Sequence, residues 1–141
     1  MQILLYEWIT GGGLVEEPSP LPASLLAEGE AMLTALAADF ASLPQSQVTV
    51  LRDIRLDAFP GTECEVVEVH SREHQYQELL RLATGADLTV VIAPEFDGIL
   101  EKTTKSLRKV ARRLLGSSDA FIAIASNKQT TAEHLAAAGV P

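Results

Sequence analysis

The stretch Leu88-Thr89-Val90-Val91-Ile92-Ala93 decides the fold class of this sequence. It is apolar on both faces that a strand presents, which is typical of a central strand in a parallel sheet covered on both sides. Around it, short apolar runs of strand length alternate with stretches whose apolar residues recur at helical spacing. Strands are predicted at 3–8, 48–51, 64–69, 88–93 and 120–125, and helices at 23–42, 74–84, 100–114 and 128–138.

Strands that alternate with helices indicate right-handed βαβ units and a parallel sheet. We therefore predict an α/β fold, a three-layer Rossmann-like domain with a five-stranded, mostly parallel sheet. The passage from 51 to 64 has room only for a loop, which we expect to close at Pro60-Gly61. That connection is the irregular one.

Composition excludes several classes of function. The chain has 141 residues, which favours one domain, and 11 Lys and Arg against 19 Asp and Glu give a net charge of −8. A negative charge argues against nucleic-acid and acidic-membrane partners. Cys64 is the only cysteine, and we interpret it as a core residue without a disulfide. There is no targeting signal or membrane span in the sequence, so we expect a cytoplasmic protein.

Ligands of open α/β sheets bind beyond the carboxyl ends of the strands, so the loops there are the candidates for a site. Thr10-Gly11-Gly12-Gly13 follows the first strand and offers backbone N–H groups that can hold a substrate carboxylate. The alternative is an ordinary tight turn. The loop is neither a GxGxxG fingerprint nor a Walker A loop.

Two more loops carry charged residues. Glu95 and Asp97 follow the strand at 88–93 and can hold a metal or position a substrate amine; alternatively, Asp97 caps the next helix and Glu95 is solvated. Ser126-Asn127-Lys128 follows the expected fifth strand. A lysine at a helix N-terminus suggests an anion or a partner, and the alternative is a Ser126 or Asn127 cap beside a solvated lysine.

The helix predicted at 100–114 is basic, with Lys102, Lys105, Arg108, Lys109, Arg112 and Arg113 beside its apolar stripe. Its positive face is either solvated or a docking surface for an acidic neighbouring domain. His70, His74 and His134 are scattered in the sequence, so we predict no metal site. We find no complete catalytic apparatus, and we assign no catalytic residue to the chain.

Three segments together resemble a known family. The opening Ile3 to Gly13 resembles the start of a group of ATP-grasp ligases that includes tyramine–glutamate ligase-like enzymes, where a strand runs into Glu-x-x-Thr/Ser-Gly-Gly-Gly. Ile92 to Leu100 is similar to their loop after the fourth strand. Ile124 to Thr131 and Leu135 to Pro141 resemble the segment Ser-Asp-Lys-x-x-Thr … Gly-Ile/Val-Pro that leads into the ATP-grasp fold.

This resemblance implies an N-terminal pre-ATP-grasp domain at 1–126 and, at 127–141, a linker helix leading into ATP-grasp lobes beyond Pro141. Such enzymes activate a carboxylate as an acylphosphate with Mg-ATP, and an amine then attacks it. The resemblance places Thr10, Gly11, Gly12, Gly13 and Glu95 at the substrate and Lys128 near the ATP phosphates. Asn127 departs from the family's Asp.

The same resemblance implies the partners of the chain: the ATP-grasp lobes, small carboxylate and amine substrates and, as one option, a second copy in a homodimer. ATP and Mg belong to the full-length protein. We expect neither in this domain alone, which would be inactive by itself.

Two other classes remain as alternatives. One is a stand-alone flavodoxin-like binding or signalling module, for which Glu7 and Lys128 fit a receiver domain loosely, whereas Val69-His70 and Ala93 do not. The other is a dinucleotide-binding domain, which the missing GxGxxG disfavours and for which Asp53 is the only candidate acid.

Overall fold

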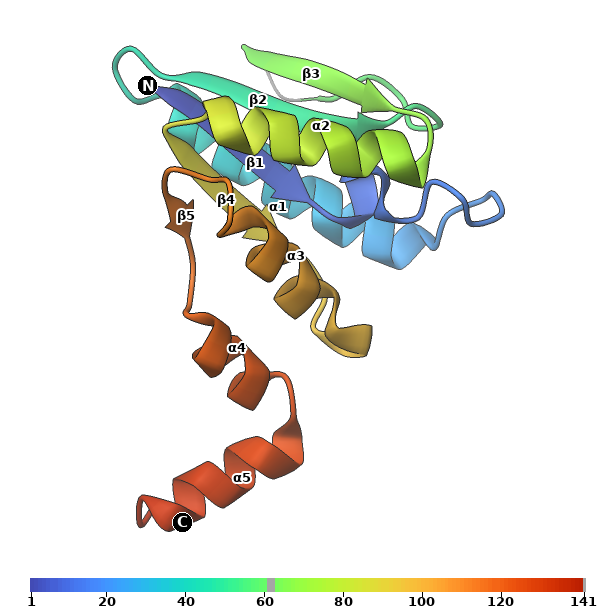
Figure 1. Ribbon diagram of the computed structural model, residues 1–141. Coiled ribbons are helices and arrows are strands. Elements are labelled where there is room, and N and C mark those ends of the chain that lie inside the picture. The colour runs from blue at the N-terminus through green and yellow to red at the C-terminus, as the bar shows by residue number, and fades with distance from the viewer. Residues whose placement is uncertain (61–62, 141) are drawn as a thin grey trace.

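A computed structural model describes residues 1–60 and 63–140, so the predicted turn at Pro60-Gly61 and the final Pro141 lie partly or wholly outside the described residues. The sheet has five parallel strands in the order β3-β2-β1-β4-β5 (Figure 1). They are β1 (Gln2–Glu7), β2 (Gln47–Asp53), β3 (Cys64–Val69), β4 (Leu88–Ile92) and β5 (Leu114–Leu115). The helices are α1 (Ala23–Ala41), α2 (Arg72–Gly85), α3 (Ile99–Leu107), α4 (Asp119–Ala125) and α5 (Lys128–Ala137).

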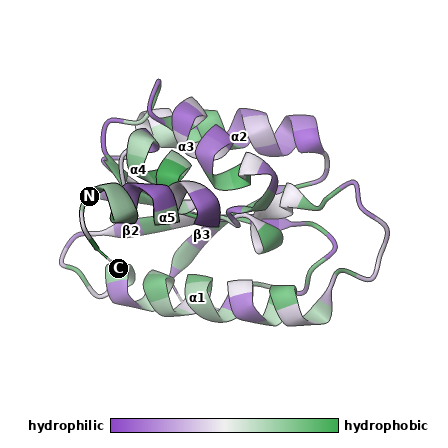
Figure 2. Ribbon diagram, turned by 90° about the horizontal axis from the view of Figure 1, so that it is seen from below, coloured by the Kyte–Doolittle hydropathy of each residue, from purple (hydrophilic) through white to green (hydrophobic). Residues whose placement is uncertain are grey.

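Helices lie on both faces of the sheet, with α1 on one side and α2 and α3 on the other (Figure 2). Residues of β1 alternate between two cores, because successive side chains of a strand point to opposite faces. The core under α1 contains Ile3, Leu5, Leu33, Ala37, Val48 and Val50. The core under α2 and α3 contains Leu4, Tyr6, Leu51, Val69, Leu79, Ala83, Ala86 and Leu107. The predicted three-layer α/β fold is confirmed.

The described residues of the link between β2 and β3, 54–60 and 63, contain no helix, as predicted. These two strands pair directly from Val48 and Cys64 to Asp53 and Val69. The next helix, α2, begins after Ser71, a residue type that is typical of a helix N-cap. The Ser71 hydroxyl accepts a hydrogen bond from the backbone N–H of His74 at 3.1 Å, which satisfies one of the free amides of the first turn.

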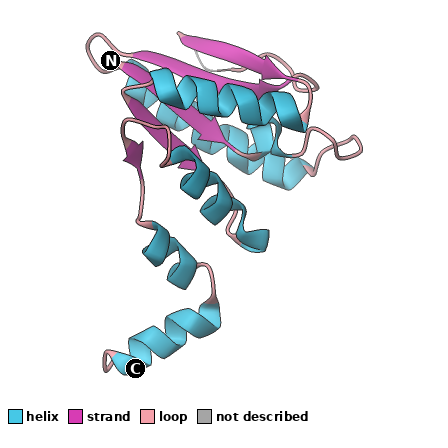
Figure 3. Ribbon diagram, viewed as in Figure 1, coloured by secondary structure: helices cyan, strands magenta, loops and turns pink. Residues whose placement is uncertain are grey.

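The predicted strand at 120–125 is wrong, because these residues belong to α4 (Figure 3). The Ser118 hydroxyl caps this helix by accepting a hydrogen bond from the N–H of Phe121. The fifth strand is instead Leu114–Leu115, which pairs with Thr89 and Val90. The helix predicted at 100–114 correspondingly ends at Leu107. A six-residue apolar run suits a short helix as well as a strand, so the pattern alone did not decide.

The last two helices form what we call the C-terminal arm, residues 119–140. In Figure 1, α4 follows β5 and α5 lies beyond α4, away from the sheet. Within the described residues, α4 buries only Ile122 and α5 buries no side chain. Phe121 is 60% exposed and Leu135 44% exposed. The arm therefore presents apolar side chains that this chain does not cover.

Candidate functional site

The order of the strands predicts a ligand site at one edge of the sheet, where the carboxyl ends of the strands lie. From β1 the chain moves to one side, to β2 and β3, and then crosses back to β4 on the other side. The carboxyl ends of β1 and β4 therefore flank a topological switch point, where open α/β sheets bind ligands. The loop from Trp8 to Gly13 follows β1, and the loop from Ala93 to Gly98 follows β4.

Glu7, the last residue of β1, is the buried anchor of the first loop. Its side chain is 2% exposed, and its two carboxylate oxygens accept hydrogen bonds from the N–H groups of Ile9 at 3.0 Å and Thr10 at 2.7 Å. Gly29 of α1 packs against it so closely that an added Cβ would lie 2.5 Å from the carboxylate. Glu7 therefore fixes the loop and joins it to α1.

The three glycines of the loop lie against large side chains. A Cβ on Gly11 would lie 2.8 Å from the ring of Tyr6, and one on Gly13 would lie 2.2 Å from the ring of Trp8. Gly12 has φ +91°, and its Cβ would lie 2.4 Å from Val69 Cγ2. Only glycine fits these close approaches, and only glycine adopts the conformation at 12 without strain.

Burial separates the members of this loop. Thr10, Gly11 and Gly12 are buried, whereas Gly13 is half-buried and lines a cleft. Of the residues predicted to contact substrate from this loop, Gly13 is therefore the one that the structure leaves accessible.

An ion pair at the end of β2, between Asp53 and Arg55, holds the segment that follows the glycines. Arg55 forms hydrogen bonds to both carboxylate oxygens of Asp53, at 2.9 and 2.6 Å, and donates to the carbonyls of Leu14 at 2.6 Å and Glu17 at 2.7 Å. Burial alone would raise the pKa of Asp53, but the hydrogen bonds and charge of Arg55 outweigh it and lower that pKa. Asp53, the candidate acid for dinucleotide binding, is thus the buried member of an ion pair that stabilises the fold.

Two clefts open at the switch point, one on each face of the sheet. The cleft beside α1 has a volume of about 290 Å³ and is mostly apolar; Ile9, Leu25, Met32 and Phe96 line it. The cleft beside α2 and α3 has a volume of about 440 Å³. Its lining includes Trp8, Gly13, Arg72, Gln75, Asp97 and Lys102.

The second cleft has both a rigid floor and charged walls. Gln75 is buried and donates to the Tyr6 hydroxyl at 2.9 Å, and burial raises the pKa of Tyr6, so that the phenol stays neutral. Lys102 donates to the backbone carbonyl of Asp97 at 2.9 Å, which leaves its positive charge at the wall of the cleft. Glu17 and Asp97 line the same cleft, so this arrangement of two cations and two acids suits a small polar ligand.

The loop after β4 carries its acids at the surface. Glu95 is exposed, between Pro94 and Phe96, which line the apolar cleft. Asp97 has φ +54° inside a short 3-10 helix, Phe96–Gly98, and the residue at the cap position of α3 is Gly98. The interpretation of Asp97 as the helix cap is therefore wrong.

The structure does not bring Lys128 to this edge. Because residues 119–125 form a helix, Lys128 begins α5 on the C-terminal arm, away from the sheet (Figure 1). Asn127 is the cap, and its side chain accepts hydrogen bonds from the N–H groups of Gln129 at 2.9 Å and Thr130 at 3.1 Å. The prediction of a cap at Asn127 is confirmed, and Lys128 is exposed.

Three of the basic residues predicted on one helix form ion pairs within the chain. Lys105 pairs with Glu101, Arg108 with Asp119 and Arg112 with Asp87. Arg108 thereby connects the end of α3 to the start of α4. The positive charges of these three residues are therefore paired within the chain, which leaves fewer of them for the predicted docking of an acidic neighbouring domain.

The loops at 7–13 and 70–74 were among the candidates, but sequence reasoning assigned no ligand-binding role to the side chains of the larger cleft, above all Trp8, Arg72, Gln75 and Lys102. Arg72 and Gln75 come from the first turn of α2, and the cap at Ser71 is the signal that could have placed them at the carboxyl edge. Among residues 1–60 and 63–140, no three His, Cys, Asp or Glu side chains are placed to hold a metal ion, although the rings of His70 and His74 stack at 4.1 Å. In the same part of the chain, every helix is too short or too polar to cross a membrane.

Fold and site together define the class of this domain: an open parallel α/β domain with its candidate site at the β1–β4 switch point. The sequence profile of the pre ATP-grasp 3 domain matches residues 46–122, more than half of the 141 residues. The chain belongs to this family of pre-ATP-grasp domains.

A solved structure supports the same fold. The chain superposes on a candidate ATP-grasp superfamily protein from Archaeoglobus fulgidus with a TM-score of 0.74 at 23% sequence identity. The match covers 97% of this chain but 40% of that one, so this chain spans less than half of its length. No curated protein matches the sequence.

Proposed function

We propose that this chain is the N-terminal, substrate-side domain of an ATP-dependent carboxylate–amine ligase. In the proposed reaction the carboxylate attacks the γ-phosphorus of ATP, releasing ADP and forming an acylphosphate. The amine then attacks the acyl carbon and releases phosphate. The observation that carries this proposal is membership of the pre-ATP-grasp family, combined with a match that covers 97% of this chain and 40% of the Archaeoglobus chain.

Exposed apolar surfaces of the described residues support the proposal that further lobes pack against this domain. The interior strand β4 is only half-buried at Leu88, Val90 and Ile92, and Leu115, which pairs beside Val90, is 51% exposed. On this face α1 covers β1 and β2. Together with the uncovered C-terminal arm, this apolar surface fits burial against a larger body.

On the substrate side, Gly13 and Glu95 are the residues that we propose to contact the acid or the amine. Gly13 lines the larger cleft, and Glu95 lies exposed beside the apolar one. Thr10, Gly11 and Gly12 contribute by shaping the loop, since they are buried. The first substrates to test are L-glutamate and tyramine, in line with the resemblance of the opening segment.

The described residues of this chain hold no cluster that fits a magnesium ion. We therefore propose that the partner lobes hold the metal and make most of the contacts to ATP. Lys128, exposed at the start of α5, is the residue that we propose to face the ATP phosphates. Its position on the arm fits a nucleotide bound away from the sheet.

The test uses the native protein, captured from its source cells with an antibody against this domain. We expect a mass well above 15.1 kDa and, with Mg-ATP, tyramine and glutamate labelled with ¹⁸O in its carboxylates, formation of ADP and of phosphate that carries one ¹⁸O. Release of AMP would contradict the acylphosphate. A native mass of 15.1 kDa would contradict the ligase and favour the stand-alone binding module.

The roles on the substrate side need a second measurement. In the ligase, Glu95→Gln should raise the KM for the amine or the acid several-fold. Glu101→Gln is the matched control, since Glu101 pairs with Lys105 on α3, whereas Glu95 lies between Pro94 and Phe96, which line the apolar cleft. Equal KM values for the two variants would remove Glu95 from the site.

A further inference from the structure

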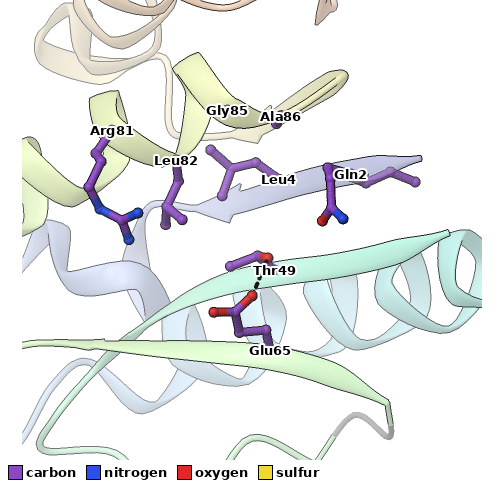
Figure 4. A pocket seen from close by; sticks show the side chains of 9 residues that line it. Gln2, Leu4, Thr49, Glu65, Arg81, Leu82, Gly85 and Ala86 are labelled. Carbon is purple, nitrogen blue, oxygen red and sulfur yellow. Dashed lines mark hydrogen bonds between the residues drawn. The ribbon is translucent and has the colours of Figure 1, made fainter.

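A groove lies at the opposite end of the sheet from the switch point, beneath the C-terminal half of α2 (Figure 4). Its volume is about 220 Å³, and β1, β2, β3 and α2 all contribute to its lining. Neither the candidate site nor the proposed ligase reaction uses it.

Two opposite charges enter this groove from different walls. Arg81 comes from α2 and Glu65 from β3, and Figure 4 shows both side chains reaching into the space between the helix and the sheet. Among the described ion pairs, none joins Arg81 to Glu65. Yet the two are close enough to interact, because the carboxylate of Glu65 adds to the larger effect of Glu78 in raising the pKa of Arg81.

Each charge is held by its own neighbour. Arg81 donates through Nε and Nη2 to the carboxylate of Glu78, at distances from 2.6 to 3.2 Å, and this leaves Nη1 outside the pair. Glu65 Oε2 accepts a hydrogen bond from the hydroxyl of Thr49, at 3.2 Å. The groove therefore lies between a cation and an anion that each have a neighbouring partner; the Arg81 side chain is 61% exposed, and Glu65 is exposed.

Apart from these charges, the polar side chains of Gln2 and Thr49 and several apolar side chains line the groove. Leu4 and Ala86 are buried, and Leu82 is half-buried, along its floor and sides. At Gly85, no described atom lies within 4 Å of the place that a Cβ would occupy, so this residue leaves the groove uncovered.

We propose that this groove binds a small zwitterion, a free α-amino acid with an apolar side chain. Its carboxylate accepts hydrogen bonds from Arg81, its ammonium donates to Glu65, and its side chain packs against Leu4, Leu82 and Ala86. The carboxylate and the ammonium of the ligand would therefore span the space between Arg81 and Glu65. Hydrogen bonds between charged groups are stronger than those between neutral groups, so these two would contribute most of the affinity. The same helix, α2, carries Arg72 and Gln75 of the switch-point cleft at its other end, so the ligand would hold one helix that borders both sites.

The test is a titration of the ¹⁵N-labelled 141-residue chain with L-leucine, followed by amide chemical shifts. We expect shifts at Leu4, Thr49 and Ala86 and a dissociation constant on the order of 1 mM. N-acetyl-L-leucine lacks the ammonium and L-leucinamide lacks the carboxylate. Each should bind about tenfold more weakly, as expected for the loss of one charged hydrogen bond.

Two variants and one control locate the site. Gly85→Leu should fill the groove and abolish binding while the fold persists, because there is open space at that position. Glu65→Gln should weaken binding about tenfold. Glu68→Gln is the matched control on the same strand, since residues three apart on a strand lie on opposite faces.

Three results would overturn the proposal: no shift with L-leucine, equal affinity for all three compounds, or unchanged binding by Gly85→Leu. All three are measured on this domain alone, so they are independent of the fate of the ligase proposal.

Discussion

The sharpest test of the glycine loop is Gly12→Ala. Gly12 combines a left-handed backbone, φ +91°, with a Cβ direction that meets Val69 Cγ2 at 2.4 Å. Val69 is the last residue of β3 and is fully buried in the core under α2, so it has little room to move. The substitution therefore strains the backbone and the packing at once.

The magnitude follows from three contributions. A left-handed conformation costs a non-glycine residue about 1–2 kcal/mol. Forcing an extra methyl group into a packed core costs about 1–3 kcal/mol. Alanine also restricts the unfolded chain, which returns about 0.4–1 kcal/mol. We expect the free energy of unfolding to fall by about 2–4 kcal/mol.

The assay is urea unfolding followed by circular dichroism, with Gly85→Ala as the matched control. Gly85 ends α2 with open space around it, so the same substitution there should stabilise the domain by about 0.4–1 kcal/mol. In a Val69→Ala background the methyl group at 12 has room, so the double variant should lose about 1–2 kcal/mol less than the sum of the single losses. Equal stability of the two alanine variants, or strict additivity with Val69→Ala, would refute the reasoning.

Three other substitutions test the buried Glu7, the Arg55–Asp53 ion pair and the cap of α5. Glu7→Gln should lower the free energy of unfolding by about 1–3 kcal/mol, since an NH₂ group would face one of the loop amides that now donate to Glu7; Glu17→Gln, at the surface, should change it little. Arg55→Met should cost about 3–5 kcal/mol at neutral pH, because Asp53 stays buried without its partner. The pKa of Asp53 is lowered in the folded chain, so its contribution is present above its unfolded pKa, about 3.9, and is lost as the pH falls through the folded value. Arg55→Met removes the side-chain hydrogen bonds and the charge of Arg55, which lower that pKa, so the pKa of Asp53 should be higher in the variant and the free energies of unfolding of the two proteins should converge on acidification; a constant difference would contradict this. Asn127→Ala should lower the amide-exchange protection of α5 by about 0.5–2 kcal/mol and leave the sheet unaffected; equal protection would remove the cap.

The central strands were predictable because their side chains are apolar on both faces. The run at 88–93 became β4 and the run at 3–8 became β1, each within two residues of the predicted bounds. Parallel neighbours and helices on both sides leave no polar face on such strands, so the sequence pattern carries the fold class directly. The loop between β2 and β3 was predictable from its length alone.

The location of the candidate site was also predictable, but the role of its glycines was not. Carboxyl ends of parallel strands meet at one edge, and this rule placed Thr10–Gly13 and Glu95 there. A run of glycines suits both a ligand and close packing. The residues that decide between them, Tyr6, Trp8 and Val69, meet the loop only in the folded chain.

The C-terminal third shows a different reason for failure, because a usable signal was present. Ala120 to Ala125 is apolar enough for a strand, but Ser118 and Asp119 before it are typical of a helix start. Ser118 caps α4, and Asp119 in its first turn pairs with Arg108 of the preceding segment. The capping residues, rather than the hydropathy of the run, determine the element.

The presence of a helix instead of a strand at 120–125 separates the predicted ATP-binding residue from the predicted substrate-binding residues. A strand at 120–125 would have placed Lys128 on the same edge as Gly13 and Glu95; a helix places it on an arm beyond the sheet. If the ligase proposal holds, the sheet edge faces the acid and the amine, whereas the arm faces ATP. The γ-phosphate must still reach the carboxylate, so the partner lobes have to occupy the space between the arm and the switch point. The uncovered apolar residues of β4, β5 and the arm border that space, and burying them is the physical reason for the lobes to pack there.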